Sequence, residues 1–250
     1  MGDGAYGEKS MKYFYCDFDS NIFKRKWYRL VLTENEDFEK ALIKETILRP
    51  DADYVDLKLG TDKSFFERIL RELKFRKICT HVTFKCDLDE QELQTEDFGT
   101  YHPLPMNTNT INEIAKKCSS IFTTSRFSLD ELLEKNLVLN FFYEWIKNSL
   151  SNDSYVKFVF NDSFCVLKPS NKDMVVDLIG VPKEYQGKGV GTKLLIDAVN
   201  YSKKEGYRGI WATTEVENSS AFRLYTKNGF KIDCFSSSFH LRISDLKGGK

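Results

Sequence analysis

The residues best suited to chemistry form a glycine-rich loop between an apolar strand-like run and an amphipathic helical pattern. The loop reads Gln186-Gly187-Lys188-Gly189-Val190-Gly191-Thr192. Because glycine has no Cβ atom, successive backbone N–H groups can converge on one anion, and the N-terminus of the following helix adds partial positive charge. The loop is therefore suited to bind a pyrophosphate group.

The spacing of this loop excludes two common phosphate-binding motifs. The dinucleotide fingerprint G-x-G-x-x-G requires a glycine where Thr192 stands, and Gly191 comes one residue early. A P-loop requires Gly-Lys followed by Ser or Thr, whereas this chain has Gly191-Thr192-Lys193. Taken alone, the stretch is also compatible with a plain loop at the start of a helix.

A second patterned segment follows the next strand-like run. Asn218 suits the N-cap of a helix, Tyr225 lies within that helix, and Gly229-Phe230 closes it. Ordinary helix structure explains these residues singly, but not the order in which the two segments occur. Together, Gln186-x-x-Gly189-x-Gly191 and the segment from Asn218 to Phe230 resemble the two cofactor motifs of the Gcn5-related N-acetyltransferase (GNAT) superfamily.

This resemblance implies a fold, a cofactor and a binding site. The expected fold class is α/β, an α+β mixed sheet of the GNAT type with an additional small N-terminal α/β domain. The expected cofactor is acetyl-CoA or a longer acyl-CoA, as acyl donor. In the resembled fold the strand 174–181 diverges from its parallel neighbour 209–214, and the pantetheine arm of the donor enters between them. The expected cofactor-binding residues are Leu178, Ile179, Val181, Gln186, Gly187, Lys188, Gly189, Val190, Gly191, Thr192, Asn218 and Ala221.

Acyl transfer to an amine requires an oxyanion to be stabilised and a leaving thiolate to be protonated. By resemblance, a backbone N–H near Leu178 or Ile179 meets the acyl carbonyl. Tyr225 is the candidate general acid, because a phenol with an ordinary pKa of about 10 is protonated at neutral pH. Asp177 or a water relay is the candidate general base. The alternatives are that Tyr225 is a half-buried helix residue and that Asp177 is a solvated strand residue.

The hydrophobic pattern predicts two domains. We expect a flexible leader at residues 1–10, a small α/β domain at 11–95, a linker at 96–106 and the acyltransferase domain at 107–245. In the small domain, Val55, Leu57 and Leu59 share one face of a strand. The elements predicted there are strands 27–32, 54–59 and 77–86 and helices 38–46 and 64–73.

In the larger domain, two hairpins precede a β-α-β-α-β run, which predicts a mixed sheet with helices packed on it. Ser128, with Glu131 three residues later, forms a capping box that predicts the start of a long helix. The predicted helices span 109–122, 129–150, 190–205 and 219–228. The predicted strands span 155–160, 164–167, 174–181, 209–214, 230–235 and 239–243.

A narrower resemblance suggests the acceptor. The small domain, the loop Ser125-Arg126-Phe127 and the helix with Phe142-Tyr143-x-Trp145-Ile146-x-Asn148-Ser149 are similar to dTDP-amino-sugar N-acetyltransferases of the fucosamine type. The resemblance implies a homodimer that acylates a nucleotide-linked dideoxyamino sugar for surface polysaccharide such as O-antigen. It places Arg126 and Phe127 near the acceptor pocket, where an arginine can pair with a diphosphate.

Several alternatives stay open. Arg126 can instead anchor the following helix, with Phe127 packing before its N-cap, and the chain has no recognisable thymine-stacking motif. The amine can belong to a peptide or a polyamine. The chain can also be a non-catalytic acyl-CoA-binding module.

Composition narrows the class of protein further. The 37 basic and 37 acidic residues give a net charge of zero, which argues against nucleic-acid binding as the main function. No run approaches the roughly 20 apolar residues of a membrane span, and residues 1–10 lack the apolar core of a secretory signal. Six scattered cysteines favour reduced thiols and a cytoplasmic protein. We expect no metal site, because Cys79, His81 and Cys86 lie in a strand-like run without a second ligand pair.

Overall fold

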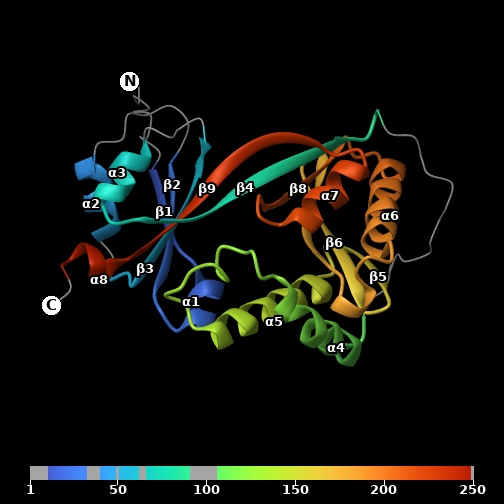
Figure 1. Cartoon of the computed structure of the whole chain (residues 1–250), viewed down its shortest axis with the longest axis horizontal. Coiled ribbons are helices and arrows are strands. Elements are labelled where there is room, and N and C mark those ends of the chain that lie inside the picture. Colours follow the sequence, from blue (N-terminus) through green and yellow to red (C-terminus); the bar gives the residue numbers. More distant parts are fainter. Residues whose placement is uncertain (1–10, 33–39, 49–50, 62–65, 91–105, 249–250) are drawn as a thin grey trace, which may run out of the picture. The chain divides into compact units, whose positions relative to one another are not determined.

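The computed structural model describes residues 11–32, 40–48, 51–61, 66–90 and 106–248. These form two compact units (Figure 1). The first contains Met1–Cys79 and Ser236–Lys250, and the second contains Thr80–Phe235. Strands β4 (Arg76–Asp87) and β9 (Lys231–Arg242) have residues in both units.

The first unit is a small sheet with helices. Its sheet has the order β1-β2-β3-β9, in which only β2 and β3 are parallel. Val55, Leu57 and Leu59 of β3 lie in one buried cluster with side chains of α2 and α3, which confirms that they share a face. The elements are β1 (Met11–Tyr15), α1 (Asp17–Phe23), β2 (Trp27–Leu32), α2 (Lys40–Leu48), β3 (Tyr54–Gly60), α3 (Phe66–Glu72) and α8 (Ile243–Leu246).

The second unit is a larger sheet with helices on both faces. Its strand order is β4-β8-β7-β6-β5, and β7 and β8 are its parallel pair. Its elements are α4 (Thr108–Cys118), the 3-10 turn η2 (Ser119–Ile121), α5 (Lys135–Ser151), β5 (Val156–Phe160), β6 (Ser163–Ser170), β7 (Asp173–Gly180), the 3-10 turn η3 (Lys183–Tyr185), α6 (Val190–Lys204), β8 (Gly209–Glu215) and α7 (Ser219–Lys227).

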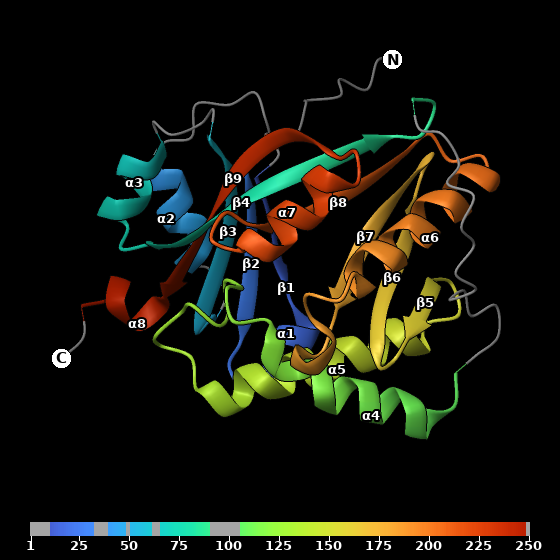
Figure 2. The ribbon, with the colours of Figure 1, turned by 45° about the vertical axis from the view of Figure 1, so that its right-hand side comes forward.

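The two faces of this larger sheet bury different clusters. Phe164, Val166 and Leu178 pack against side chains of α4 and α5. Cys165, Leu167, Met174 and Val176 point the other way, toward α6 and α7. Figure 2 shows α4 and α5 on one side of β5, β6 and β7, and α6 on the other. The prediction of a mixed sheet with helices packed on it is confirmed.

The capping-box prediction is wrong. Helix α5 begins at Lys135, after the N-cap residue Glu134. The hydroxyl of Ser128 instead donates to the carbonyl of Phe122 at 2.5 Å. The buried carboxylate of Asp130 accepts a hydrogen bond from the N–H of Leu132, so a local turn occupies the positions where the helix was expected to start.

Two further differences concern strands. The expected pair of strands at 230–235 and 239–243 is one continuous strand, β9. Ser236, Ser237 and Ser238 resemble a turn in sequence, but they are buried and pair with Gly60, Leu59 and Lys58 of β3. The sequence interpretation also missed β1 and α1.

The compact units differ from the segments expected from the sequence. Residues 80–87 of β4 pair with β8, so they belong with the second unit. Residues 236–242 of β9 pair with β3, so they belong with the first. The expected leader at 1–10 and most of the expected linker at 96–106 lie outside the described residues.

Gly180 provides a test of this packing. It pairs with Phe164 across β6 and β7, and an added Cβ would lie 2.6 Å from Cε1 of that ring. We expect Gly180→Ala to lower the free energy of unfolding by about 1–3 kcal/mol, because the ring must move within a packed core. Urea denaturation measures the change.

Gly191→Ala is the matched control for that measurement. Its added Cβ would make only an ordinary contact, 3.5 Å from Leu224, and it lies inside a helix where alanine is favoured. Equal effects of the two substitutions would contradict the packing described here.

Candidate active site

The site is built around the point where β7 and β8 separate. The two strands pair only at Asp173 with Gly209, Met174 with Ile210 and Val175 with Trp211. Beyond that point β7 stays paired with β6 as far as Gly180, and β8 stays paired with β4 as far as Glu215. Among the described residues, the β7–β8 pairing does not extend to the facing edges of 176–180 and 212–214. Backbone groups at such an edge are available to a ligand that lies between the strands.

A β-bulge occurs on β7 just beyond this point. Leu167 of β6 pairs with Val176, whereas the preceding Val166 pairs with Leu178, so Asp177 is an extra residue in the strand. A bulge bends its strand and re-aims the side chains that follow. Here Leu178 packs with the α4 and α5 cluster, and Ile179 packs against the cluster on the opposite face.

The carboxylate of Asp177 lies on the α5 side of the sheet. Its Oδ2 accepts a hydrogen bond from Oγ of Ser149 at 2.5 Å and another from Nε1 of Trp145 at 3.3 Å. The structure thus gives the candidate base two donors from one helix. Sequence reasoning did not assign Ser149 or Trp145 to the site, although their spacing of four residues on a helix is the signal that places them on one face.

The glycine-rich loop connects β7 to α6. Gly187 has a φ of 73° and Gly189 a φ of 79°, values that side chains with a Cβ rarely adopt. A Cβ at either position would have no described atom within 4 Å, so the backbone there is open to a ligand. The side chain of Gln186 donates from Nε2 to the carbonyl of Val181 at 2.9 Å and braces the loop.

The start of α6 completes a site for an anion. Lys193 donates its backbone N–H to the carbonyl of Gly189 at 3.0 Å, at the first turn of the helix. The N–H groups of Gly191 and Thr192 precede this bond, and the positive end of the helix dipole lies there. The residues present therefore fit a pyrophosphate group.

Helix α7 lies beside this loop. The Cβ position of Gly191 is 3.5 Å from Leu224 of α7 and 3.7 Å from Val181, so the end of β7, the start of α6 and α7 meet. Asn218 caps α7 as expected, with Oδ1 accepting from the N–H of Ala221 at 3.1 Å. The two sequence motifs are thus adjacent in space.

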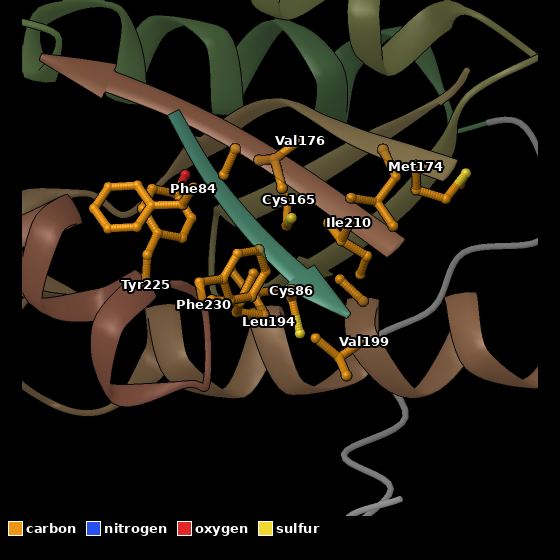
Figure 3. Packing of buried hydrophobic residues seen from close by; sticks show 14 of the residues in the cluster. Phe84, Cys86, Cys165, Met174, Val176, Leu194, Val199, Ile210, Tyr225 and Phe230 are labelled. Carbon is orange, nitrogen blue, oxygen red and sulfur yellow. The ribbon is translucent and has the colours of Figure 1, made fainter. Parts of the chain in front are cut away.

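Tyr225 of α7 is buried and not half-buried, with 2% of its surface exposed. Its ring centroid lies 5.4 Å from that of Phe84 and 5.4 Å from that of Phe230, and Figure 3 shows the three rings in one cluster. This burial raises the pKa of the Tyr225 hydroxyl above its usual value. The phenol therefore carries its proton at neutral pH and can donate it.

The residues expected near the acceptor lie before α5. Phe127 is 3% exposed, and its ring centroid is 4.3 Å from that of Phe141, so it packs in the core. The guanidinium of Arg126 lies over the Phe127 ring at 4.5 Å.

Two other features of the described residues bear on function. No group of three or more His, Cys, Asp or Glu side chains is arranged to hold a metal ion in the described ranges. Across those same ranges, every helix is too short or too polar to cross a membrane.

Comparisons with known proteins agree with this geometry. Residues 141–230 match the model of the acetyltransferase (GNAT) family. A GCN5-related N-acetyltransferase from Sphaerobacter thermophilus superimposes with a TM-score of 0.60 at 11% identity, covering 92% of this chain and 76% of that one. Residues 141–230 are therefore similar to a GNAT acetyltransferase domain, and the chain has the fold of its GNAT structural neighbours. Enzymes of this class use acetyl-CoA as acyl donor.

Two curated relatives are similar in sequence. The spore coat polysaccharide biosynthesis protein SpsD of Bacillus subtilis is 26% identical over 144 residues, which are 56% of this chain and 49% of SpsD. The chain thus spans about half of the length of that relative. N-alpha-acetyltransferase 30 of Schizosaccharomyces pombe is 29% identical over 105 residues, which are 41% of this chain and 69% of that protein.

Gly189 tests the assignment of the anion site. We expect Gly189→Ala to raise the Kd for coenzyme A about tenfold or more. A Cβ disfavours the positive φ of Gly189, and a change of that φ would turn the backbone N–H groups of the loop away from the ligand. Isothermal titration calorimetry measures the affinity.

Gly206→Ala is the matched control, because Gly206 follows the other end of α6, with a φ of 80° and nothing within 4 Å of its Cβ position. The two variants are expected to lose similar stability, while Gly206→Ala keeps its affinity for coenzyme A. Equal affinities in the two variants would remove the loop from the site.

Proposed function

We propose that the chain is an acyl-CoA-dependent N-acyltransferase that acts on the amine of a nucleotide-linked dideoxyamino sugar. The observation that carries the proposal is the separation of β7 and β8 next to the loop of Gly187 and Gly189. The name of SpsD, a polysaccharide biosynthesis protein, supports a sugar acceptor. In this proposal the sugar is a dTDP-amino sugar destined for surface polysaccharide such as O-antigen.

The donor supplies an activated acyl group, acetyl or longer, as a thioester. Backbone groups from Gln186 to Thr192 hold its pyrophosphate. The free edge of β7 at Leu178 and Ile179, together with Val181 just after the strand, binds its pantetheine arm. Asn218 and Ala221 border this arm from α7. The N–H of Ile179 donates to the acyl oxygen as negative charge develops there.

Two side chains move protons in this proposal. Asp177 accepts the proton of the acceptor amine, directly or through water, so that the amine can attack the acyl carbon. The carbon–sulfur bond then breaks, and Tyr225 protonates the departing thiolate. Tyr225 is protonated at neutral pH, as a proton donor for this step must be.

The acceptor side is assigned to the segment before α5. In this proposal Arg126 pairs with the diphosphate of the nucleotide sugar. The Phe127 ring, which lies under the guanidinium, holds the Arg126 side chain in place. We also propose that the enzyme is a cytoplasmic homodimer, and light scattering in solution tests the dimer.

Tyr225→Phe tests the general acid. We expect kcat to fall about 100-fold, because a positioned proton donor contributes on that order or more. Affinity for coenzyme A is expected to stay unchanged, because the ring keeps its place between Phe84 and Phe230. Tyr155→Phe, at a phenol packed with the α4 and α5 cluster, is the control. Turnover of Tyr225→Phe equal to that of the control would refute the role of the hydroxyl.

A screen of acceptors tests the substrate class. Release of free thiol from acetyl-CoA is measured with dTDP-amino sugars, with peptides bearing free N-termini and with polyamines. We expect turnover with the nucleotide sugars. The identity with N-alpha-acetyltransferase 30 makes a peptide amine the second candidate. Turnover of peptides alone would select that candidate, and binding of coenzyme A without any thiol release would favour a non-catalytic acyl-CoA-binding module.

A further inference from the structure

The bulge of β7 is attached to a helix by a pair of hydrogen bonds. Ser149 and Trp145 lie one turn apart on α5 and donate to the same oxygen, Oδ2 of Asp177. Ser149 is 3% exposed, and the side chains beside it, Ile146, Leu150 and Leu178, belong to one apolar cluster. A carboxylate at the border of such a cluster needs hydrogen-bond donors, because an ionised group without them is costly to bury.

These bonds bear on the register of the strand. The extra residue lets Asp177 and Leu178, which are consecutive, both lie on the α5 side, so that Ile179 lies on the α6 side. Without the bulge, strict alternation would exchange the faces of Leu178 and Ile179. The hydrogen bonds from α5 favour the bulged register, since they hold the extra residue on its own side of the sheet.

The affected segment is the one assigned to the acyl group. It starts directly after β7 has left β8, where the strand keeps its β6 pairing alone. A small displacement there would move the backbone donor away from the reacting carbonyl, and misplacement by about 1 Å can cost on the order of 100-fold in rate.

We propose that Ser149 and Trp145 are positioning residues for acyl transfer: through Asp177 they hold the bulge of β7 and thereby aim the backbone of Leu178 and Ile179. The inference rests on the proposed function of this strand. It gives α5 a role in the reaction, and it assigns that role to two residues that act through Asp177.

The test compares variants that remove one donor each. Ser149→Ala deletes the hydroxyl, and Trp145→Phe deletes Nε1–H while keeping an aromatic ring beside Phe141 and Phe142. We expect each to lower kcat about tenfold and the double variant about 100-fold, with the KM for acetyl-CoA within about twofold of wild type. Ser149→Thr keeps a hydroxyl and is expected to restore most of the lost kcat.

Tyr143→Phe is the matched control. The Tyr143 hydroxyl also links α5 to a neighbour, Oδ1 of Asn112 on α4 at 3.2 Å, and this hydrogen bond goes to α4 and not to the Asp177 carboxylate. We expect this variant to lose similar thermal stability and to keep its kcat. If Ser149→Ala and Trp145→Phe lower kcat by no more than Tyr143→Phe does, the proposal is overturned.

A second readout does not depend on activity. Hydrogen exchange of the amides from Val176 to Gly180, followed by mass spectrometry, is expected to accelerate about tenfold in the double variant and not in Tyr143→Phe, because the bulge opens more often. Unchanged exchange would refute the positioning role. A wild-type chain that transfers no acyl group would refute the proposed function instead, and the exchange data would still decide whether α5 holds the bulge.

Discussion

The parallel pair β7 and β8 is joined over only three residue pairs, and the rest of the second unit is arranged around the point where they part. Two sheet edges without strand partners carry a cost, because unpaired peptide groups must find other partners. Each strand is held apart from the other by its outer neighbour, β6 or β4, and by the helices on the two faces. The separation is therefore a built feature of the sheet, and it leaves backbone donors for a ligand.

The loop and helices next to the separation use glycines where backbone atoms must come close to a ligand or to a neighbouring helix. Gly187 and Gly189 adopt positive φ, and the start of α6 comes close to α7 at Gly191. A site made of peptide N–H groups adds nothing to the formal charge of the chain. Zero net charge therefore argues against nucleic-acid binding as the main function but not against a tightly held pyrophosphate, for which oriented backbone dipoles suffice.

Local signals in the sequence predicted the features that depend on local geometry. The glycine spacing from Gln186 to Gly191, the cap at Asn218 and the alternation in β3 are decided by neighbouring residues, and the structure agrees with each. The failures have tertiary causes. The capping box at Ser128 is the exception, because a competing local turn takes its hydroxyl to the carbonyl of Phe122, six residues earlier. The serines of β9 form strand because β3 pairs with them. The bulge at Asp177 could not be predicted, because it depends on donors from α5 and on the register of β6.

The central claim is that the acyl donor binds where β7 and β8 separate. A crystal structure of the chain with coenzyme A tests this directly. We expect the pyrophosphate on the N–H groups between Gln186 and Thr192 and the pantetheine arm between β7 and β8, beyond Val175 and Trp211. Coenzyme A bound elsewhere, or β7 and β8 paired along their whole length in the complex, would contradict the account.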